Sequence, residues 1–166
     1  MRVLGIDCGT AYTGYGVVKL HENGKLQCLD SGAIKLSPRD SMASKLATIF
    51  NRLSALISEH QPTQVAIEEV FYSLNVKSAL KLGQVRGVAM LAASSVGLAV
   101  VEYSPLTIKS AVVGYGKAEK IQVQHMVTRL LNLAEIPEPA DAADALAIAI
   151  CHLHTSTTLQ RQRAMA

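Results

Sequence analysis

Residues 2–10 have the sequence RVLGIDCGT, a short apolar run that carries one acidic side chain, Asp7. An apolar run of this length, closed by a glycine, predicts a strand buried in a sheet. Two further strand-like runs follow, Tyr12–Leu20 and Lys25–Leu36, and the Asn-Gly pair between them predicts a hairpin. The chain is therefore expected to open with three antiparallel strands.

The rest of the chain alternates between helical and strand patterns. Apolar residues at helical spacing predict a helix over residues 41–60, which Pro62 ends. A strand over Val65–Val70, a long helix over residues 75–95 and a strand over Leu98–Tyr103 predict two parallel strands joined by a helical crossover. Three more helices are expected, near residues 106–113, 119–133 and 140–154.

This order of elements predicts the fold class. Three antiparallel strands, a helix, a β-α-β unit and terminal helices follow one another in the ribonuclease H-like architecture, an α/β fold. We therefore expect a five-stranded mixed sheet, with three antiparallel strands and then parallel strands, and helices on both faces. One such domain accounts for residues 1–154, because a chain of 166 residues leaves little room for a second. Residues 155–166 are polar and basic, and we expect a disordered tail there.

Composition narrows the class of protein. An aromatic fraction of 4% within a hydrophobic fraction of 49% means that the core must be aliphatic. A net charge of +3 permits a nucleic-acid partner without requiring one. Three scattered cysteines with no CxxC pair disfavour a disulfide framework or a zinc site and favour a reducing compartment. With no signal-peptide pattern and no apolar stretch long enough for a bilayer, we expect a cytoplasmic protein outside the membrane.

Four acidic residues stand where secondary-structure propensity alone would not place them. Asp7 closes the first strand, Glu68 lies in the fourth, and Asp141 and Asp144 open the last helix. Carboxylates are depleted in strands, and burying one without a partner is costly. Asp141 and Asp144 share one helical face because they are three residues apart. If the last helix packs over neighbouring first and fourth strands, the four carboxylates converge.

Each acid also has a simpler interpretation. Asp7 could be a turn residue, and Glu68 could pair with a lysine at a strand edge. Asp141 and Asp144 could cap the last helix and complement its dipole. The four acids together favour a metal site, because converging carboxylates repel one another unless cations lie between them. Hard oxygen ligands suit Mg²⁺, with Mn²⁺ as a substitute. Two such ions, about 3.5–4 Å apart, would support hydrolysis of a phosphodiester.

At this point the motifs resemble those of a known family. The segments LGIDCGT, AIEEVF, SALKLGQVRGVAM, AVVGYGKAEKIQVQHMV and DAADALAIAICH follow the motifs of the RuvC-type Holliday junction resolvases, in order and at similar spacing, over residues 2–154. The chain departs from the usual pattern at Cys8, where proline is common, and at Glu69, where glutamine is frequent. Neither position carries a matched catalytic role, but Cys8 places a soft thiol beside the expected metal site.

The resemblance implies a structure-specific endonuclease of DNA recombination and repair. It would nick two symmetry-related strands of a four-way junction with Mg²⁺, two ions per active site, and leave 5′-phosphate and 3′-hydroxyl ends. It implies a homodimer and an association with a RuvA–RuvB branch-migration complex. By matching position, the four acids would bind the metal, Phe71 would contact unpaired bases at the crossover, and Lys109 and Lys120 would lie near DNA phosphates.

The residues by themselves leave alternatives open for these contacts. An aromatic just past a strand end could stack on a base, but Phe71 could equally cover the sheet. Lys77, Lys81 and Arg86 recur along the long helix. A run of charge on a helix is most often a solvated face, and we favour that interpretation for Lys77 and Lys81. A stripe of small residues on the same helix would admit a close neighbour, either the protein's own sheet or a two-fold partner. It consists of Ala79, Gly83 and Gly87.

Three other functions are compatible with parts of the pattern. GIDCGT resembles the phosphate-binding loop of sugar kinases and actin-like ATPases, but those proteins need a second such domain, and this chain shows no second copy. A non-cleaving junction-binding protein would keep basic residues without needing four acids. A ribonuclease H-like nuclease with a different substrate is harder to exclude, because the acids alone do not name the substrate.

Overall fold

The computed structural model describes residues 1–69 and 75–164, except for the side chains of residues 159–164. Its element order is β1(Arg2–Asp7), β2(Tyr12–Leu20), β3(Leu26–Lys35), α1(Met42–His60), β4(Gln64–Glu68), α2(Val76–Ser94), β5(Val100–Tyr103), α3(Pro105–Val113), α4(Lys120–Leu130) and α5(Ala140–Ala164). The strands form one sheet in the order β3-β2-β1-β4-β5. β1 to β3 pair antiparallel, whereas β4 pairs parallel with both β1 and β5. The predicted mixed sheet is therefore confirmed.

The ends of several elements follow local signals in the sequence. In the turn between β2 and β3, Gly24 has a φ of +82°, a conformation that glycine adopts without steric cost. The backbone N–H of His21 donates to the carbonyl of Lys25 and closes the hairpin at 2.9 Å. α1 begins after Ser41, whose hydroxyl accepts a hydrogen bond from the backbone N–H of Ser44 at 3.2 Å.

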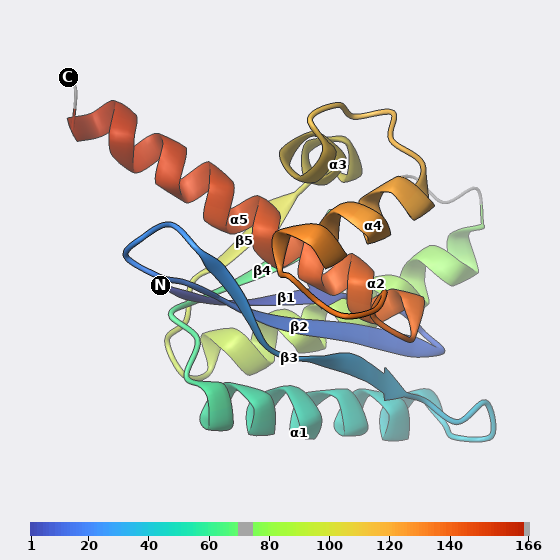
Figure 1. Cartoon of the computed structure of the whole chain (residues 1–166). Coiled ribbons are helices and arrows are strands. Elements are labelled where there is room, and N and C mark those ends of the chain that lie inside the picture. Colours follow the sequence, from blue (N-terminus) through green and yellow to red (C-terminus); the bar gives the residue numbers. More distant parts are fainter. Residues whose placement is uncertain (70–74, 165–166) are drawn as a thin grey trace.

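Helices cover both faces of the sheet, as expected (Figure 1). Leu4, Ile6 and Val17 point into a core shared with α1 and α2. Val3 and Val18 point the other way, into a core that α3, α4 and α5 close. This alternation follows from the period of two residues along a strand. Figure 1 shows α5 running across one face of the sheet and α1 along the other.

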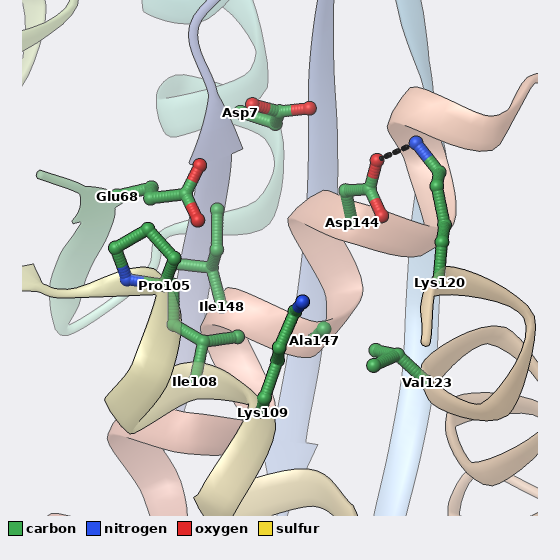
Figure 2. Close-up of a pocket in the computed structure, with 10 residues that line it drawn as sticks. All are labelled: Asp7, Glu68, Pro105, Ile108, Lys109, Lys120, Val123, Asp144, Ala147 and Ile148. Carbon is green, nitrogen blue, oxygen red and sulfur yellow. Dashed lines mark hydrogen bonds and ion pairs between the residues drawn. The ribbon is translucent and has the colours of Figure 1, made fainter. Parts of the chain in front are cut away.

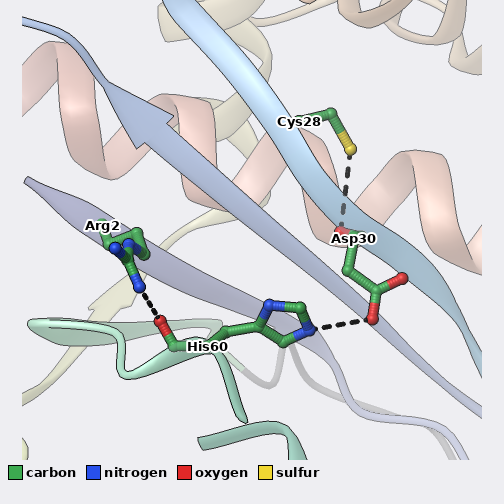
Figure 3. A network of polar contacts seen from close by, with 4 residues as sticks. All are labelled: Arg2, Cys28, Asp30 and His60. Atoms are coloured by element: carbon green, nitrogen blue, oxygen red, sulfur yellow. Dashed lines mark hydrogen bonds and ion pairs between the residues drawn. The ribbon is translucent and has the colours of Figure 1, made fainter.

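Polar contacts join the first residue of β1 to neighbouring elements (Figure 3). The Arg2 guanidinium donates to the carbonyl of His60, the last residue of α1. The His60 imidazole in turn lies 3.1 Å from a carboxylate oxygen of Asp30 on β3. The Cys28 thiol donates to the Asp30 carbonyl at 3.7 Å. The two contacts of His60 hold α1 against the sheet at the end of β1 opposite Asp7.

The last helix differs from the prediction. α5 continues to Ala164, so the expectation of a disordered tail from residue 155 is wrong for the backbone of residues 155–164. Hydroxyl groups after His154 bond back to the helix: Thr157 donates to the Leu153 carbonyl at 2.7 Å, and Thr158 donates to the His154 carbonyl at 2.9 Å. These bonds satisfy side chains that would otherwise compete with the helical backbone. In the described chain no helix combines the length and apolar character needed to cross a membrane.

Candidate active site

Two glycines allow α5 to approach the sheet closely enough to form a site. A Cβ on Gly5 would lie 2.1 Å from the carbonyl oxygen of Ala145, and a Cβ on Gly14 would lie 2.1 Å from that of Asp141. No larger residue fits, so α5 packs directly on β1 and β2. Gly14 is the register partner of Asp7. The first turn of α5 therefore lies over the strand end that carries Asp7.

Strand alternation brings Asp7 and Glu68 to the same face. Val3 and Ala66 lie in the core beneath α5, and Asp7 and Glu68 follow them at even spacing along β1 and β4. These two strands are parallel neighbours, with Ile6 opposite Ile67 in the register. Both carboxylates consequently stand at adjacent strand ends on the side of the sheet that α5 covers.

A cavity of about 220 Å³ opens where these strands meet the helices (Figure 2). Figure 2 shows the carboxylates of Asp7, Glu68 and Asp144 and the ammonium groups of Lys109 and Lys120 directed into the same space. The cavity combines acidic and basic side chains with an apolar wall from α3, α4 and α5. Its lining residues are Asp7, Glu68, Pro105, Ile108, Lys109, Lys120, Val123, Asp144, Ala147 and Ile148.

The acids in this cavity destabilise one another's charges. Burial, followed by the neighbouring charges of Asp144, Glu68 and Asp141, raises the pKa of Asp7 to about 7. The pKa of Glu68 is also raised, first by burial and then by Asp144. Lys120 opposes both increases. The site therefore has an excess of negative charge that cations would relieve.

Two lysines supply part of the compensating charge. The ammonium group of Lys120, at the start of α4, lies 2.5 Å from a carboxylate oxygen of Asp144. This hydrogen bond raises the pKa of Lys120, so the side chain stays protonated. Lys109 projects from α3 and lowers the pKa of Glu68 by its charge. Both lysines predicted from the family motif thus lie with the acids, and neither is merely part of a solvated face.

The simpler interpretations of the acids can now be compared with their surroundings. Asp7 ends a strand and Glu68 lies on an interior strand, so neither is a turn or edge residue. Glu68 belongs to none of the ion pairs found in the described part of the chain. α5 begins at Ala140, so Asp141 lies in its first turn and not at the capping position. Asp144 is paired with Lys120.

The acidic side chains of the site do not form a complete set of metal ligands in this arrangement. Within residues 1–69 and 75–164, no group of three or more acidic, histidine or cysteine side chains is arranged to hold an ion. Asp141 is not among the residues that line the cavity, although its charge acts on Asp7. Two effects keep the carboxylates apart. Their negative charges repel one another, and Asp144 is held in an ion pair with Lys120.

One residue beside the site was left unassigned by the sequence, and one lies outside the described residues. Lys77 and Lys81 are exposed on α2, as expected of a solvated face. Arg86 belongs to the same charged run, but its side chain is only 12% exposed and its guanidinium donates to the backbone carbonyl of Glu68. Helical spacing could not separate these residues, because the partners of Arg86 come from β4 and β5. Phe71 falls in residues 70–74, outside the described residues.

Comparisons with known proteins show which family the chain resembles. The model of the family described as crossover junction endodeoxyribonuclease RuvC matches residues 3–152. The RuvC protein of Koribacter versatilis is 64% identical over 166 residues, covering 100% of both chains. The structure of Thermus thermophilus RuvC superposes with a TM-score of 0.88 at 35% identity, covering 95% of this chain and 96% of that one.

A second Thermus thermophilus structure contains the ligand of that enzyme. This complex of RuvC with a Holliday junction substrate has a TM-score of 0.88 at 32% identity, again covering 95% of this chain and 96% of the other. The family match spans residues 3–152, and the structural likeness covers 95% of this chain. The chain belongs to the RuvC family of crossover junction endodeoxyribonucleases.

Proposed function

We propose that this chain is a structure-specific endonuclease that resolves four-way DNA junctions in recombination and repair. Its family membership and its likeness to an enzyme bound to a Holliday junction support this substrate. The observation that carries the chemistry is the pKa of Asp7, which burial and three neighbouring acids raise to about 7. Bound cations would relieve the repulsion within such a cluster of carboxylates.

The acids of the site fit Mg²⁺, with Mn²⁺ as a substitute. Asp7, Glu68, Asp141 and Asp144 offer only hard oxygen ligands, which these ions prefer. We propose that these four side chains hold two ions. When bound, the ions would lower the pKa of a water nucleophile and stabilise the leaving oxygen of the phosphodiester. The products would carry 5′-phosphate and 3′-hydroxyl ends.

The lysines of the site would have a second task once DNA is present. Lys120 neutralises Asp144 in the free protein, and cations entering the site would release its ammonium group. Lys120 and Lys109 would then face the phosphates of the strand to be cut. The apolar wall formed by Pro105, Ile108 and Val123 would limit the entry of water from that side. Phe71 is proposed to stack on bases exposed at the crossover.

A homodimer would provide the two active sites that paired nicks require. One chain carries one set of four acids, and a four-way junction has approximate two-fold symmetry. An exposed apolar face of α2 favours this helix as the contact: Leu80 is 66% exposed and Leu91 is 56% exposed. Among the described residues, a Cβ on Gly83 or Gly87 would meet no atom within 4 Å, so these glycines do not pack on the protein's own sheet. We propose that a second copy covers this face.

The compartment and partners proposed for this chain follow from its family membership. The cysteines Cys8, Cys28 and Cys151 are all free thiols, which fits a reducing cytoplasm. We propose that the enzyme acts there on junctions delivered by a RuvA–RuvB branch-migration complex. Cys8 is an unreactive neighbour of the site in the absence of metal, because burial raises the pKa of its thiol to about 12.

A cleavage assay with matched substrates tests the function. Labelled four-way junction, linear duplex and single-stranded DNA would be incubated with Mg²⁺, Mn²⁺, Ca²⁺ or EDTA. We expect symmetric nicks in the junction alone with Mg²⁺ or Mn²⁺, binding without appreciable cleavage in Ca²⁺, and binding without cleavage in EDTA. The variant Asp7→Asn should bind but not cut, whereas the exposed control Asp40→Asn should cut normally. Junction cleavage in EDTA would exclude the metal mechanism.

The dimer is tested separately by sedimentation at micromolar concentration. Leu80→Asp should convert a dimer into monomers and abolish paired nicking, because it places a charge in an apolar contact. Leu106→Asp, at a similarly exposed position on α3, is the control and should stay dimeric. A wild-type protein that remains a monomer, both free and on the junction, would remove the dimer from the proposal.

A further inference from the structure

Arg86 connects α2 with the two strands at the edge of the active site. One nitrogen of its guanidinium donates to the backbone carbonyl of Glu68, the last residue of β4. The other terminal nitrogen donates to the carboxylate of Glu102 on β5. The Arg86 side chain is 12% exposed and that of Glu102 is 40% exposed. A single, largely buried cation therefore joins one helix and two parallel strands.

The Glu68 carbonyl that Arg86 contacts lies just past the end of the pairing between β1 and β4. The register of β1 with β4 ends at Ile6 and Ile67, one residue before Glu68. On the other side, Glu68 lies opposite Tyr103, and the backbone N–H of Glu69 donates to the Tyr103 carbonyl at 2.8 Å. β4 itself ends at Glu68. Arg86 thus adds a contact at the residue that carries a candidate metal ligand, just past its pairing with β1.

The chemistry of the side chain suits this position. A guanidinium group is planar, stays charged and presents several donors in fixed directions, so it can bond a carbonyl and a carboxylate at once. A lysine ammonium group is a single charged point and cannot reproduce that planar geometry. Burying this charge is tolerable only because both partners are present. Arg86 also lines a cavity of about 130 Å³ that reaches Asp7, Cys8 and Glu68 from the α2 side.

We propose that Arg86 is a positioning residue, which holds the backbone of Glu68 so that its carboxylate stays directed at the metal-binding acids. The inference rests on the proposed metal-dependent function. Arg86 would act through the Glu68 carbonyl and would touch neither metal nor DNA. Residues that orient metal ligands in this indirect way commonly change metal affinity by about 10- to 100-fold when they are replaced.

The test measures metal binding directly, apart from catalysis. Mn²⁺ binding would be followed by electron paramagnetic resonance and the Mg²⁺ requirement by titration of junction cleavage. For Arg86→Gln we expect half-saturation to rise about tenfold in both titrations, with cleavage largely recovered at saturating Mg²⁺. Junction binding in EDTA should be unchanged. Arg86→Lys should fall between the wild type and Arg86→Gln, because it restores the charge but not the planar fork.

Two further variants separate the carbonyl contact from the ion pair. Glu102→Gln keeps Arg86 on the Glu68 carbonyl, so its Mn²⁺ half-saturation should stay within about threefold of the wild type, well below the change expected for loss of an orienting contact. Arg52→Gln, an exposed change on α1, should have no effect. If Arg86→Gln does not fold, the ranking of wild type, Glu102→Gln and Arg86→Lys still tests the idea.

The outcomes that contradict the inference differ from those that contradict the proposed function. A folded Arg86→Gln or Arg86→Lys variant with wild-type Mn²⁺ half-saturation would overturn the role of Arg86. So would a Glu102→Gln variant as impaired as Arg86→Lys, because the ion pair would then be the element that matters. A wild-type protein that binds no Mn²⁺ and cuts no junction would instead overturn the proposed function.

Discussion

Replacing Asp7 by Asn should stabilise the metal-free protein at pH 8. At this pH the wild-type carboxyl is ionised, close to Glu68, Asp141 and Asp144, in a largely buried position. An amide of nearly the same shape removes the charge without removing side-chain volume. The same substitution should abolish metal-dependent cleavage, so stability and activity should change in opposite directions. Such a trade is expected where function requires unfavourable charge.

The magnitude follows from the pKa of Asp7. Its rise from 3.8 to about 7 is about 3 pKa units, which at about 1.4 kcal/mol per unit sets an upper bound on the order of 4 kcal/mol. The folded chain binds this proton more tightly than the unfolded chain, so this group lowers wild-type stability as pH rises from about 4 to about 7. Below pH 4 both states are protonated, and the difference between wild type and variant should nearly vanish.

Urea unfolding in EDTA at several pH values between 4 and 8 would measure this difference. We expect Asp7→Asn to exceed the wild type by about 1–4 kcal/mol at pH 8, which corresponds to a melting temperature higher by several degrees. Adding Mg²⁺ should stabilise the wild type more than the variant, because only the wild type keeps all four ligands. The exposed control Asp40→Asn should behave like the wild type throughout.

Two results would refute this reasoning. One is a stability difference that does not change between pH 4 and pH 8, since charge repulsion must disappear when the carboxyl is protonated. The other is an Asp7→Asn variant that is less stable than the wild type at pH 8 in EDTA. That result would mean that the Asp7 carboxylate makes a favourable contact in the ion-free fold.

Three further outcomes are expected. Gly5→Ala should destabilise the fold by about 1–3 kcal/mol or more and reduce cleavage, because its methyl group would meet the Ala145 carbonyl at 2.1 Å. Thermal melting measures the loss of stability, and cleavage rates measure the loss of activity. The double variant Lys109→Ala, Lys120→Ala should bind the junction more weakly and with a smaller dependence on salt concentration. An unchanged salt dependence would show that neither lysine contacts a DNA phosphate. Phe71→Ala should lower junction cleavage strongly while leaving the melting temperature within about 1 °C, whereas equal losses in both would assign Phe71 to the core.

Local patterns predicted most of the fold. The apolar run of β1, the Asn-Gly hairpin after β2 and the helical spacing of α1 each depend on neighbours in the chain, and the structure confirms them. The end of α5 was predicted wrongly. Polarity alone indicated a disordered tail after His154, whereas the hydroxyl groups of Thr157 and Thr158 bond back to the preceding turn.

The candidate site was predicted only in outline. Acids at unusual places marked Asp7, Glu68, Asp141 and Asp144, since a charge in a strand is conspicuous in any sequence. Their proximity could not be derived in the same way. It depends on the close approach of α5 to the sheet at Gly5 and Gly14, and in a sequence these glycines resemble any others.

The order of residues along the chain therefore makes four carboxylates, two lysines and an aliphatic scaffold available for chemistry. Which of these groups act on one another depends on how the elements pack in three dimensions. Arg86 differs from Lys77 and Lys81 only because β4 and β5 bring the Glu68 carbonyl and the Glu102 carboxylate to its guanidinium. Asp7 acquires a pKa of about 7 only once burial removes water and other elements bring their charges near. Such effects fall off steeply with distance through space, and separation along the chain does not determine that distance.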